Sequence, residues 1–253
     1  MSCPRHGGAA LAPVYQPKTY RHWVSNRGLV SFSVIVKETD LFISATSGLE
    51  KEALKAVRGQ RALLEGYIES HPLFATSLEP LPVASDAPPL VREMAEAAAR
   101  AGVGPMAAVA GAIAELVGRE LLPLSPEVIV ENGGDIFLKT SRKRLVGLYA
   151  GESALSGKLA FEVWPEETPL GVCTSSGSVG HSLSMGKADA VVVFSPSAAV
   201  ADAAATAIGN RVQSADDIAA AVEFARTIEG VGGVVIVVGD HLGLWGQVRI
   251  ARV

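Results

Sequence analysis

The sequence has little cysteine, little excess charge and no long apolar run, and each shortage excludes a class of protein. Among 253 residues there are two cysteines, Cys3 and Cys173, too few and too badly placed for a disulfide framework or a thiolate metal site. Charged residues make up 19% of the chain and the formal net charge is -4, which argues against a nucleic-acid-binding surface. No stretch has the length of a signal-peptide core or a membrane span, so we expect a soluble, cytoplasmic protein without nucleic-acid or membrane partners.

The apolar content, 49%, is enough for a sizeable core. Residues 1–17 mix Gly, Pro and Ala without periodicity and are expected to be a flexible N-terminal arm. Residues 18–253 are expected to form a single domain of two halves, each running from strands to helices. The join is expected within residues 78–130, where Leu78 to Pro89 breaks every periodic pattern.

Short β-prone runs and helical patterns follow one another along the chain. Strands are predicted at 32–36, 41–45, 127–130, 136–138, 142–149, 159–163, 190–194, 234–238 and 244–250, the last two as a hairpin, and helices at 50–70, 90–101, 105–122, 197–210 and 214–228. Within 105–122, the many small residues and Gly111 indicate that a second helix or a ligand approaches closely. The basic residues Arg142, Lys143 and Arg144 are expected in a solvated turn.

The stretch from Gly171 to Asn210 contains most of the residues that could carry chemistry. The loop Thr174 to Ser178 is rich in hydroxyls and glycine, a composition typical of chains that approach phosphate closely. His181 follows as a candidate proton acceptor, although a histidine in this setting is more often structural. Cys173 could be a nucleophile or sulfur carrier if loop amides lowered its pKa, or simply a small residue.

Further along, Asp202 and Thr206 are four residues apart and lie on one face of the predicted helix, where two hard oxygens could bind magnesium. The helix dipole would also favour the aspartate, and the threonine could bond a backbone carbonyl, so spacing leaves both interpretations open. Upstream, Asn132-Gly133-Gly134-Asp135 separates two strands. By local sequence a plain hairpin turn explains it, because Asn and Gly tolerate positive φ.

Three blocks, taken in order, resemble the ApbE-like flavin transferases. Asn132-Gly133-Gly134-Asp135 matches the N-x-G-G-D block, Cys173 to Gly177 matches A-T-S-G, and Ala201 to Ala207 matches A-D-A-x-A-T-A. Met106 to Glu115 resembles a diverged form of the family's G-G-I-A-K-G-Y-A-x-D helix. The resemblance covers Pro105 to Asn210 and hardly extends to the first hundred residues.

The resemblance implies an α+β fold, a duplicated T-fold with antiparallel sheets packed against helices. It also implies FAD and magnesium as cofactors, with transfer of FMN to a threonine of a target protein or hydrolysis of FAD. His181 occupies the position of the family's histidine, and Asp202 and Thr206 those of its magnesium ligands. The residues implied to bind the cofactor are Asn132, Gly133, Gly134, Asp135, Thr174, Ser175, Ser176 and Gly177.

Departures from the family pattern indicate a divergent branch. Ala110 stands where the family has lysine, and the H-x-x-D-P-x-T-G block is reduced to His181 to Gly186 without its Asp-Pro. Similar proteins have been linked to sulfur metabolism and homocysteine formation in anaerobes. The alternative function is therefore an accessory protein that binds a flavin or another small molecule without transferase activity. A target or pathway protein is the implied partner, and a homo-oligomer is left open.

Overall fold

The structure, a computed structural model, describes residues 24, 26–177 and 185–252 of the chain. The predicted N-terminal arm, Ser178 and the candidate proton acceptor His181 lie outside these residues. The division into an arm and one domain therefore stays a prediction.

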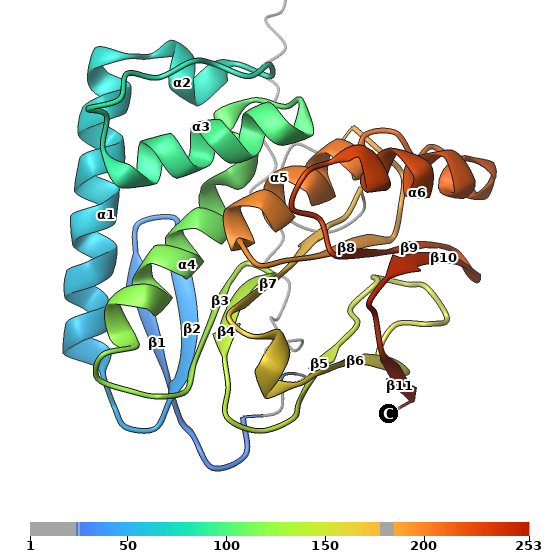
Figure 1. Ribbon diagram of the computed structural model, residues 1–253, viewed down its shortest axis with the longest axis horizontal. Helices are drawn as coiled ribbons and strands as arrows, with labels where there is room; N and C mark the ends of the chain where they lie inside the picture. Colours follow the sequence, from blue (N-terminus) through green and yellow to red (C-terminus); the bar gives the residue numbers. More distant parts are fainter. Residues whose placement is uncertain (1–23, 25, 178–184, 253) are drawn as a thin grey trace, which may run out of the picture.

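Eight antiparallel strands form the large sheet, in the order β1-β2-β3-β4-β7-β8-β9-β10 (Figure 1). These strands are β1 (Val30–Val36), β2 (Thr39–Ala45), β3 (Val128–Asn132), β4 (Asp135–Lys139), β7 (Leu170–Ser175), β8 (Ala190–Ser195), β9 (Gly233–Val238) and β10 (His241–Gly246). A small antiparallel sheet has the order β11-β6-β5. Its strands are β5 (Arg144–Gly147), β6 (Leu159–Val163) and β11 (Ile250–Arg252).

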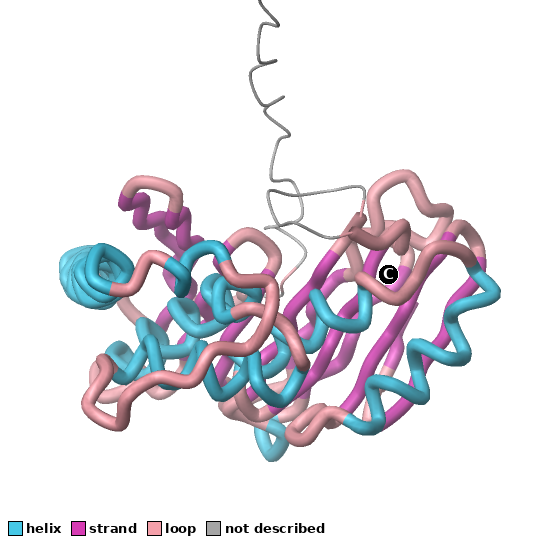
Figure 2. Tube along the Cα trace, turned by 90° about the horizontal axis from the view of Figure 1, so that it is seen from above, coloured by secondary structure: helices cyan, strands magenta, loops and turns pink. Residues whose placement is uncertain are grey.

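The helices pack on one face of the large sheet, as Figures 1 and 2 show. They are α1 (Glu50–Ser70), α2 (Leu73–Thr76), α3 (Pro89–Ala101), α4 (Val109–Leu121), α5 (Ala198–Gly209) and α6 (Ile218–Thr227). In chain order, β1 and β2 are followed by α1 to α4 and then β3 and β4, while β7 and β8 are followed by α5, α6, β9 and β10. This α+β architecture of antiparallel sheets and helices confirms the predicted fold class.

Two hydrophobic cores lie on opposite faces of the large sheet. Because side chains alternate along a strand, Val234 and Ile236 of β9 pack with the helices, while Val235 and Val237 pack with the small sheet. Both faces of β9 are therefore buried, which explains its continuous run of β-branched residues and confirms the predicted buried strand.

The described helices include no single one that is long and apolar enough to cross a membrane. The two helical segments Pro89–Ala101 and Pro105–Leu121 have the required length and apolar composition only when they are taken together, and the chain bends by 104° between them.

The solvated turn predicted for the basic trio is correct for Arg142 and Lys143 and wrong for Arg144. Arg144 is 1% exposed, because it begins β5 and alternation turns its side chain inward. Its Nη2 donates to Glu127 Oε2 at 2.6 Å, and its Nη1 donates to the carbonyl oxygen of Arg27 at 2.9 Å. A buried ion pair therefore joins the small sheet to the start of β3.

The predicted C-terminal hairpin exists, but its second strand is misplaced by the sequence. His241 is the first residue of β10 and pairs with Val238, so it is a strand residue and not part of the turn. The strand ends at Gly246, which has φ 91°, and Ile250 belongs to β11 of the small sheet. A glycine in the left-handed region ends the pairing and redirects the chain.

Candidate functional site

The residues predicted to form a phosphate loop after Gly171 divide between a strand and the segment beyond it. Thr174 and Ser175 are the last two residues of β7 and pair with Val192 and Val191 of β8. The expectation of a loop beginning at Thr174 is therefore wrong, because β-branched partners on β8 extend the ladder. Of the predicted loop, only Ser176 and Gly177 are both described by the structure and located after the end of β7.

Cys173 faces the helices and is fully buried. Its thiol donates a hydrogen bond to the Ala198 carbonyl oxygen at 3.3 Å. Burial, together with the nearby carboxylates of Asp135 and Asp202, raises the pKa of Cys173 well above its ordinary value. A neutral, buried thiol is a poor nucleophile, so the structure favours the interpretation of Cys173 as a small packing residue.

Two acidic residues distant in sequence, Asp135 on β4 and Asp202 on α5, interact electrostatically beside this cysteine. Burial raises the pKa of Asp135 from 3.8 to about 7, despite hydrogen bonds from the Thr174 backbone N–H at 3.3 Å and from Cys173. Burial and the charge of Asp135 likewise raise the pKa of Asp202 well above its ordinary value. The negative charge of Glu131 adds to the rise for Asp135, and the charge of Asp135 disfavours ionisation of Asp202. A cation beside Asp135 and Asp202 would relieve this repulsion.

Asp202 also connects α5 to the start of α4. Its Oδ2 accepts a hydrogen bond from the Gly111 N–H at 2.9 Å, and the Ala110 N–H also lowers its pKa. The carboxyl group of Asp202 therefore interacts with the positive end of the α4 dipole as well as with the dipole of its own helix, α5. Thr206 lies one turn later on α5, and both residues are partly exposed among buried alanines.

Glu115 on α4 provides the reciprocal connection, and it was not singled out from the sequence. It is fully buried, and its Oε2 accepts hydrogen bonds from the Ala198 N–H at 2.7 Å and the Ser197 hydroxyl at 3.0 Å, at the start of α5. Its Oε1 pairs with Arg119. The available signal was an acidic residue within the small and apolar run from Val109 to Val117, since a carboxylate on such a buried face needs hydrogen-bond donors.

Gly111 in α4 is explained by helix packing. A Cβ added to Gly111 would lie 2.2 Å from the Ala198 carbonyl oxygen and 2.8 Å from the Asp202 Cβ. Of the two alternatives for this position, a close helix and not a ligand approaches Gly111. The absent side chain is what lets Asp202 reach the amides of α4.

Asn132-Gly133-Gly134-Asp135 forms the hairpin turn between β3 and β4, with Asn132 paired to Asp135. Gly133 and Gly134 have φ of 68° and 110°, which L-residues rarely adopt. The turn is fixed from both sides, since Glu131 Oε1 accepts the Gly134 N–H at 2.8 Å and Asn132 Nδ2 donates to the Ala110 carbonyl oxygen at 3.1 Å. The hairpin interpretation is thus correct, and it places Asp135 beside α5.

A slot of about 110 Å³ lies between the two sheets, beside this turn. The large sheet contributes Glu131, Gly133, Gly134, Ile136, Val172, Thr174, Ser176 and Val192, and the opposite wall consists of Val24, Val146, Gly147, Leu148, Tyr149 and Phe161. Thr174 links the slot to the carboxylates, because its side chain lines the slot while its amide bonds Asp135. Small-molecule sites usually have about 300–1,000 Å³, so only part of a nucleotide would fit within the slot.

The described residues contain no group of three or more His, Cys, Asp or Glu side chains arranged for a metal ion. Magnesium needs fewer protein ligands, because it keeps several waters and shares phosphate oxygens. The hydroxyl of Ser175, two residues after Cys173 on the same strand face, is buried and has no hydrogen-bond partner among the described residues. An unpartnered buried hydroxyl near two carboxylates that resist ionisation is a donor set that fits a hard cation.

Structural comparison places the chain among proteins with the ApbE fold. It is similar to the crystal structure of the ApbE protein of Thermotoga maritima, with a TM-score of 0.54 and 12% identity over 87% of this chain and 97% of that one. It is also similar to the flavinyl transferase ApbE of Pseudomonas stutzeri in its apo form, with a TM-score of 0.52 and 15% identity over 87% and 95%.

Residues 21–244 match the family described as AbpE bacteria, and the chain belongs to that family. The chain is 45% identical over 221 residues to a UPF0280 protein of Methanococcus maripaludis strain C5, covering 85% of this chain and 90% of the relative. A UPF0280 protein of Methanopyrus kandleri is 46% identical over 227 residues, covering 87% and 91%. The chain thus belongs to a divergent branch of the ApbE-like proteins, as the sequence motifs indicated.

Proposed function

We propose that this protein binds a flavin nucleotide, FAD, together with magnesium, and acts on its pyrophosphate bond. The observation that carries the proposal is the pair of carboxylates, Asp135 and Asp202, whose pKa values are both raised. Neighbouring carboxyl groups whose pKa values are strongly perturbed are typical of functional sites. Membership in a family whose fold includes a flavinyl transferase supports the choice of ligand.

In this proposal Asp135, Asp202, Thr206 and Ser175 hold magnesium through carboxylate and hydroxyl oxygens. When bound, the metal supplies positive charge that stabilises the pyrophosphate as its bond is cleaved. The amides and hydroxyls of Ser176 and Gly177 and the turn Asn132 to Asp135 orient the nucleotide. Thr174 and the slot between the sheets take one edge of a planar ring.

His181 remains the proposed proton acceptor for the hydroxyl that attacks the phosphorus, a threonine of a target protein or water. His181→Gln is expected to abolish turnover and to leave ligand affinity nearly intact. The matched control is His71→Gln, at the C-terminal end of α1, where the histidine ring stacks on Tyr67 with ring centroids 4.2 Å apart. Equal turnover of His181→Gln and the parent would remove the assignment.

The reaction is tested by incubating the protein with FAD and magnesium and measuring AMP and flavin separately. Free FMN with AMP indicates hydrolysis, whereas protein-bound flavin with AMP indicates transfer. Flavin binding without AMP would favour the accessory function in sulfur metabolism, for which the buried thiol of Cys173 offers no support. If neither bound flavin nor AMP is detected, the proposal fails.

The metal site is tested by magnesium titration in a calorimeter, with and without FAD, on the parent, Asp202→Asn and Asp135→Asn. Both substitutions should weaken magnesium binding, because each removes a negatively charged ligand. The control is Asp240→Asn, which removes a carboxylate that is 84% exposed in the turn before β10. Equal magnesium affinity in the parent and Asp202→Asn would exclude Asp202 as a ligand.

Magnesium binding should also depend on pH in a defined direction. The pKa of Asp135 is about 7, so the carboxyl group is protonated below that pH and must release its proton to bind the metal. The affinity for magnesium should therefore rise from about pH 6 to about pH 8, with proton release detectable in buffers of different ionisation enthalpy.

The predicted cytoplasmic location stays a prediction, to be tested by fractionation.

A further inference from the structure

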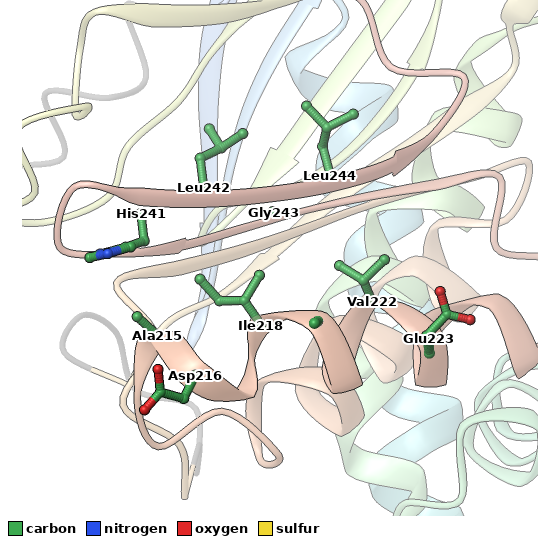
Figure 3. Close-up of a pocket in the computed structure, with 10 residues that line it drawn as sticks. Ala215, Asp216, Ile218, Val222, Glu223, His241, Leu242, Gly243 and Leu244 are labelled. Atoms are coloured by element: carbon green, nitrogen blue, oxygen red, sulfur yellow. The ribbon is translucent and has the colours of Figure 1, made fainter.

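A second cavity, distant from the proposed site, lies along the edge of the large sheet. This groove has about 530 Å³ and runs between β10 and the segment that leads into α6. Figure 3 shows its walls, with Ile218 and Val222 pointing from α6 toward β10. Its lining consists of Ala215, Asp216, Ile218, Ala219, Val222, Glu223, His241, Leu242, Gly243 and Leu244.

The edge is apolar on both faces of β10. On the helix side, Gly243 contributes no side chain, and a Cβ there would lie 2.2 Å from Cγ2 of Ile218. Leu242 and Leu244 point away from α6, to the opposite face of the strand (Figure 3), and Leu244 is 49% exposed. A strand added beside β10 would therefore find apolar surface for side chains on both of its faces.

The strand itself lacks the devices by which proteins usually block a sheet edge. It is the last strand of the large sheet among the described residues, and its sequence, HLGLWG, contains no lysine or proline. The opposite edge, β1, has two exposed serines, Ser31 and Ser33, between its exposed apolar residues Val30 and Ile35. Half of the backbone N–H and C=O groups of an edge strand point outward, ready to pair with another chain.

The charges around the groove select the kind of partner. Asp216 and Glu223 line it, Asp240 adjoins it, and no lysine or arginine is among its lining residues. Glu223 is paired with Arg226 at 3.0 Å, so the acidic character is concentrated at the His241 end, near Asp216. A second copy of β10 would bring a further acidic rim, whereas a basic segment would be complementary.

We propose that β10 binds an extended segment of a partner polypeptide that adds a strand to the large sheet. Its alternate side chains are apolar and pack on Ile218 and Val222, and a lysine or arginine lies at the Asp216 end. Main-chain hydrogen bonds supply affinity, and the groove and its charge supply selectivity, as in other cases of strand addition. The proposal is independent of flavin chemistry.

The probe is a capped peptide, Lys-Thr-Val-Thr-Val-Thr-Lys, in which the lysines and valines share one face of the extended chain, titrated into the full-length protein by calorimetry. The comparison peptide has glutamate in place of both lysines. The lysine peptide should bind roughly three- to tenfold more tightly, with an advantage that shrinks as salt is added. Amide hydrogen exchange should slow in β10 and not in β1, which is the internal control for a sheet edge.

Two variants of the protein test the groove itself. Asp216→Lys should reverse the preference between the peptides, while Glu229→Lys, which makes the same charge change at an exposed residue beyond α6, should preserve it. Failure of the lysine peptide to bind at about 1 mM would overturn the proposal. The proposal would also fail if the parent and Asp216→Lys showed the same preference between the lysine and glutamate peptides. Slowed amide exchange in β10 that depends on protein concentration in the absence of peptide would overturn it too, because it would indicate pairing of two copies.

Discussion

Replacing Gly111 by alanine should destabilise the protein, although alanine is the better helix former. The substitution adds one methyl group where α4 crosses α5. The new Cβ would lie 2.2 Å from the Ala198 carbonyl oxygen and 2.8 Å from the Asp202 Cβ, distances that cannot be kept. The two helices must separate, and the contacts that join them must lengthen.

Opposing effects set the magnitude. Alanine gains about 1 kcal/mol over glycine in helix propensity. Overpacking costs about 1–3 kcal/mol. Separation of the helices also weakens the hydrogen bonds from Gly111 to Asp202 and from Ala198 to Glu115, each worth about 0.5–1.5 kcal/mol. We expect a net loss in the free energy of unfolding on the order of 3 kcal/mol.

Urea denaturation followed by circular dichroism measures this change. The matched control is Gly59→Ala in α1, where an added Cβ meets no atom within 4 Å, so the same substitution should stabilise the protein. Gly111→Ala should also weaken magnesium binding, since Asp202 moves with α5. If Gly111→Ala proved as stable as the parent, the account of the helix crossing would be wrong.

Three further predictions concern buried polar groups. Arg144→Met should lower the free energy of unfolding by about 3–5 kcal/mol in thermal melts, because it removes the buried ionic partner of Glu127 and leaves only the exposed Arg142, 3.6 Å away. Burial favours protonation of Glu127, but hydrogen bonds from Ser141, Arg144 and Thr140 outweigh this effect and lower its pKa from 4.5 to about 2. The stability that ionised Glu127 contributes is therefore present above pH 4.5 and is lost as the pH falls toward 2. Asp135→Asn should stabilise the magnesium-free protein more at pH 8 than at pH 5, because the raised pKa of about 7 means that stability is lost as pH rises through that value. Cys173→Ala should leave flavin and magnesium affinity unchanged in titrations, and a marked loss would restore a chemical role for the thiol.

The strands and helices could be predicted largely from local patterns, whereas the partners of buried polar residues could not. Helix 50–70 and the buried strand near residues 234–238 follow from periodicity that tertiary contacts reinforce. Arg144 was misread because a basic trio looks solvated until Glu127, 17 residues away in sequence, is placed beside it. Long-range pairing of this kind leaves no periodic signal.

The candidate site shows the same division. Motif order pointed to Asp135 and Asp202, but only the fold reveals that the charge of Asp135 raises the pKa of Asp202 and that Asp202 accepts a hydrogen bond from α4. Thr174 and Ser175 were expected in a loop because hydroxyls and glycine are common there. The strand continues through them because β8 offers Val191 and Val192 as partners, which is a tertiary effect on local propensity.

The reciprocal bonds between α4 and α5 have a consequence for how the protein acquires its site during folding. The contact of Gly111 with Asp202 spans 91 residues, and that of Ala198 with Glu115 spans 83. Closing such long loops is entropically costly, so we expect these contacts to form after the local strands and helices on either side of them. A ribosome-bound chain that ends before α5 would contain Asp135 and the glycine turn but would lack Asp202, and so would lack the proposed cation site. Under the proposed function, affinity for magnesium would then report completion of the fold.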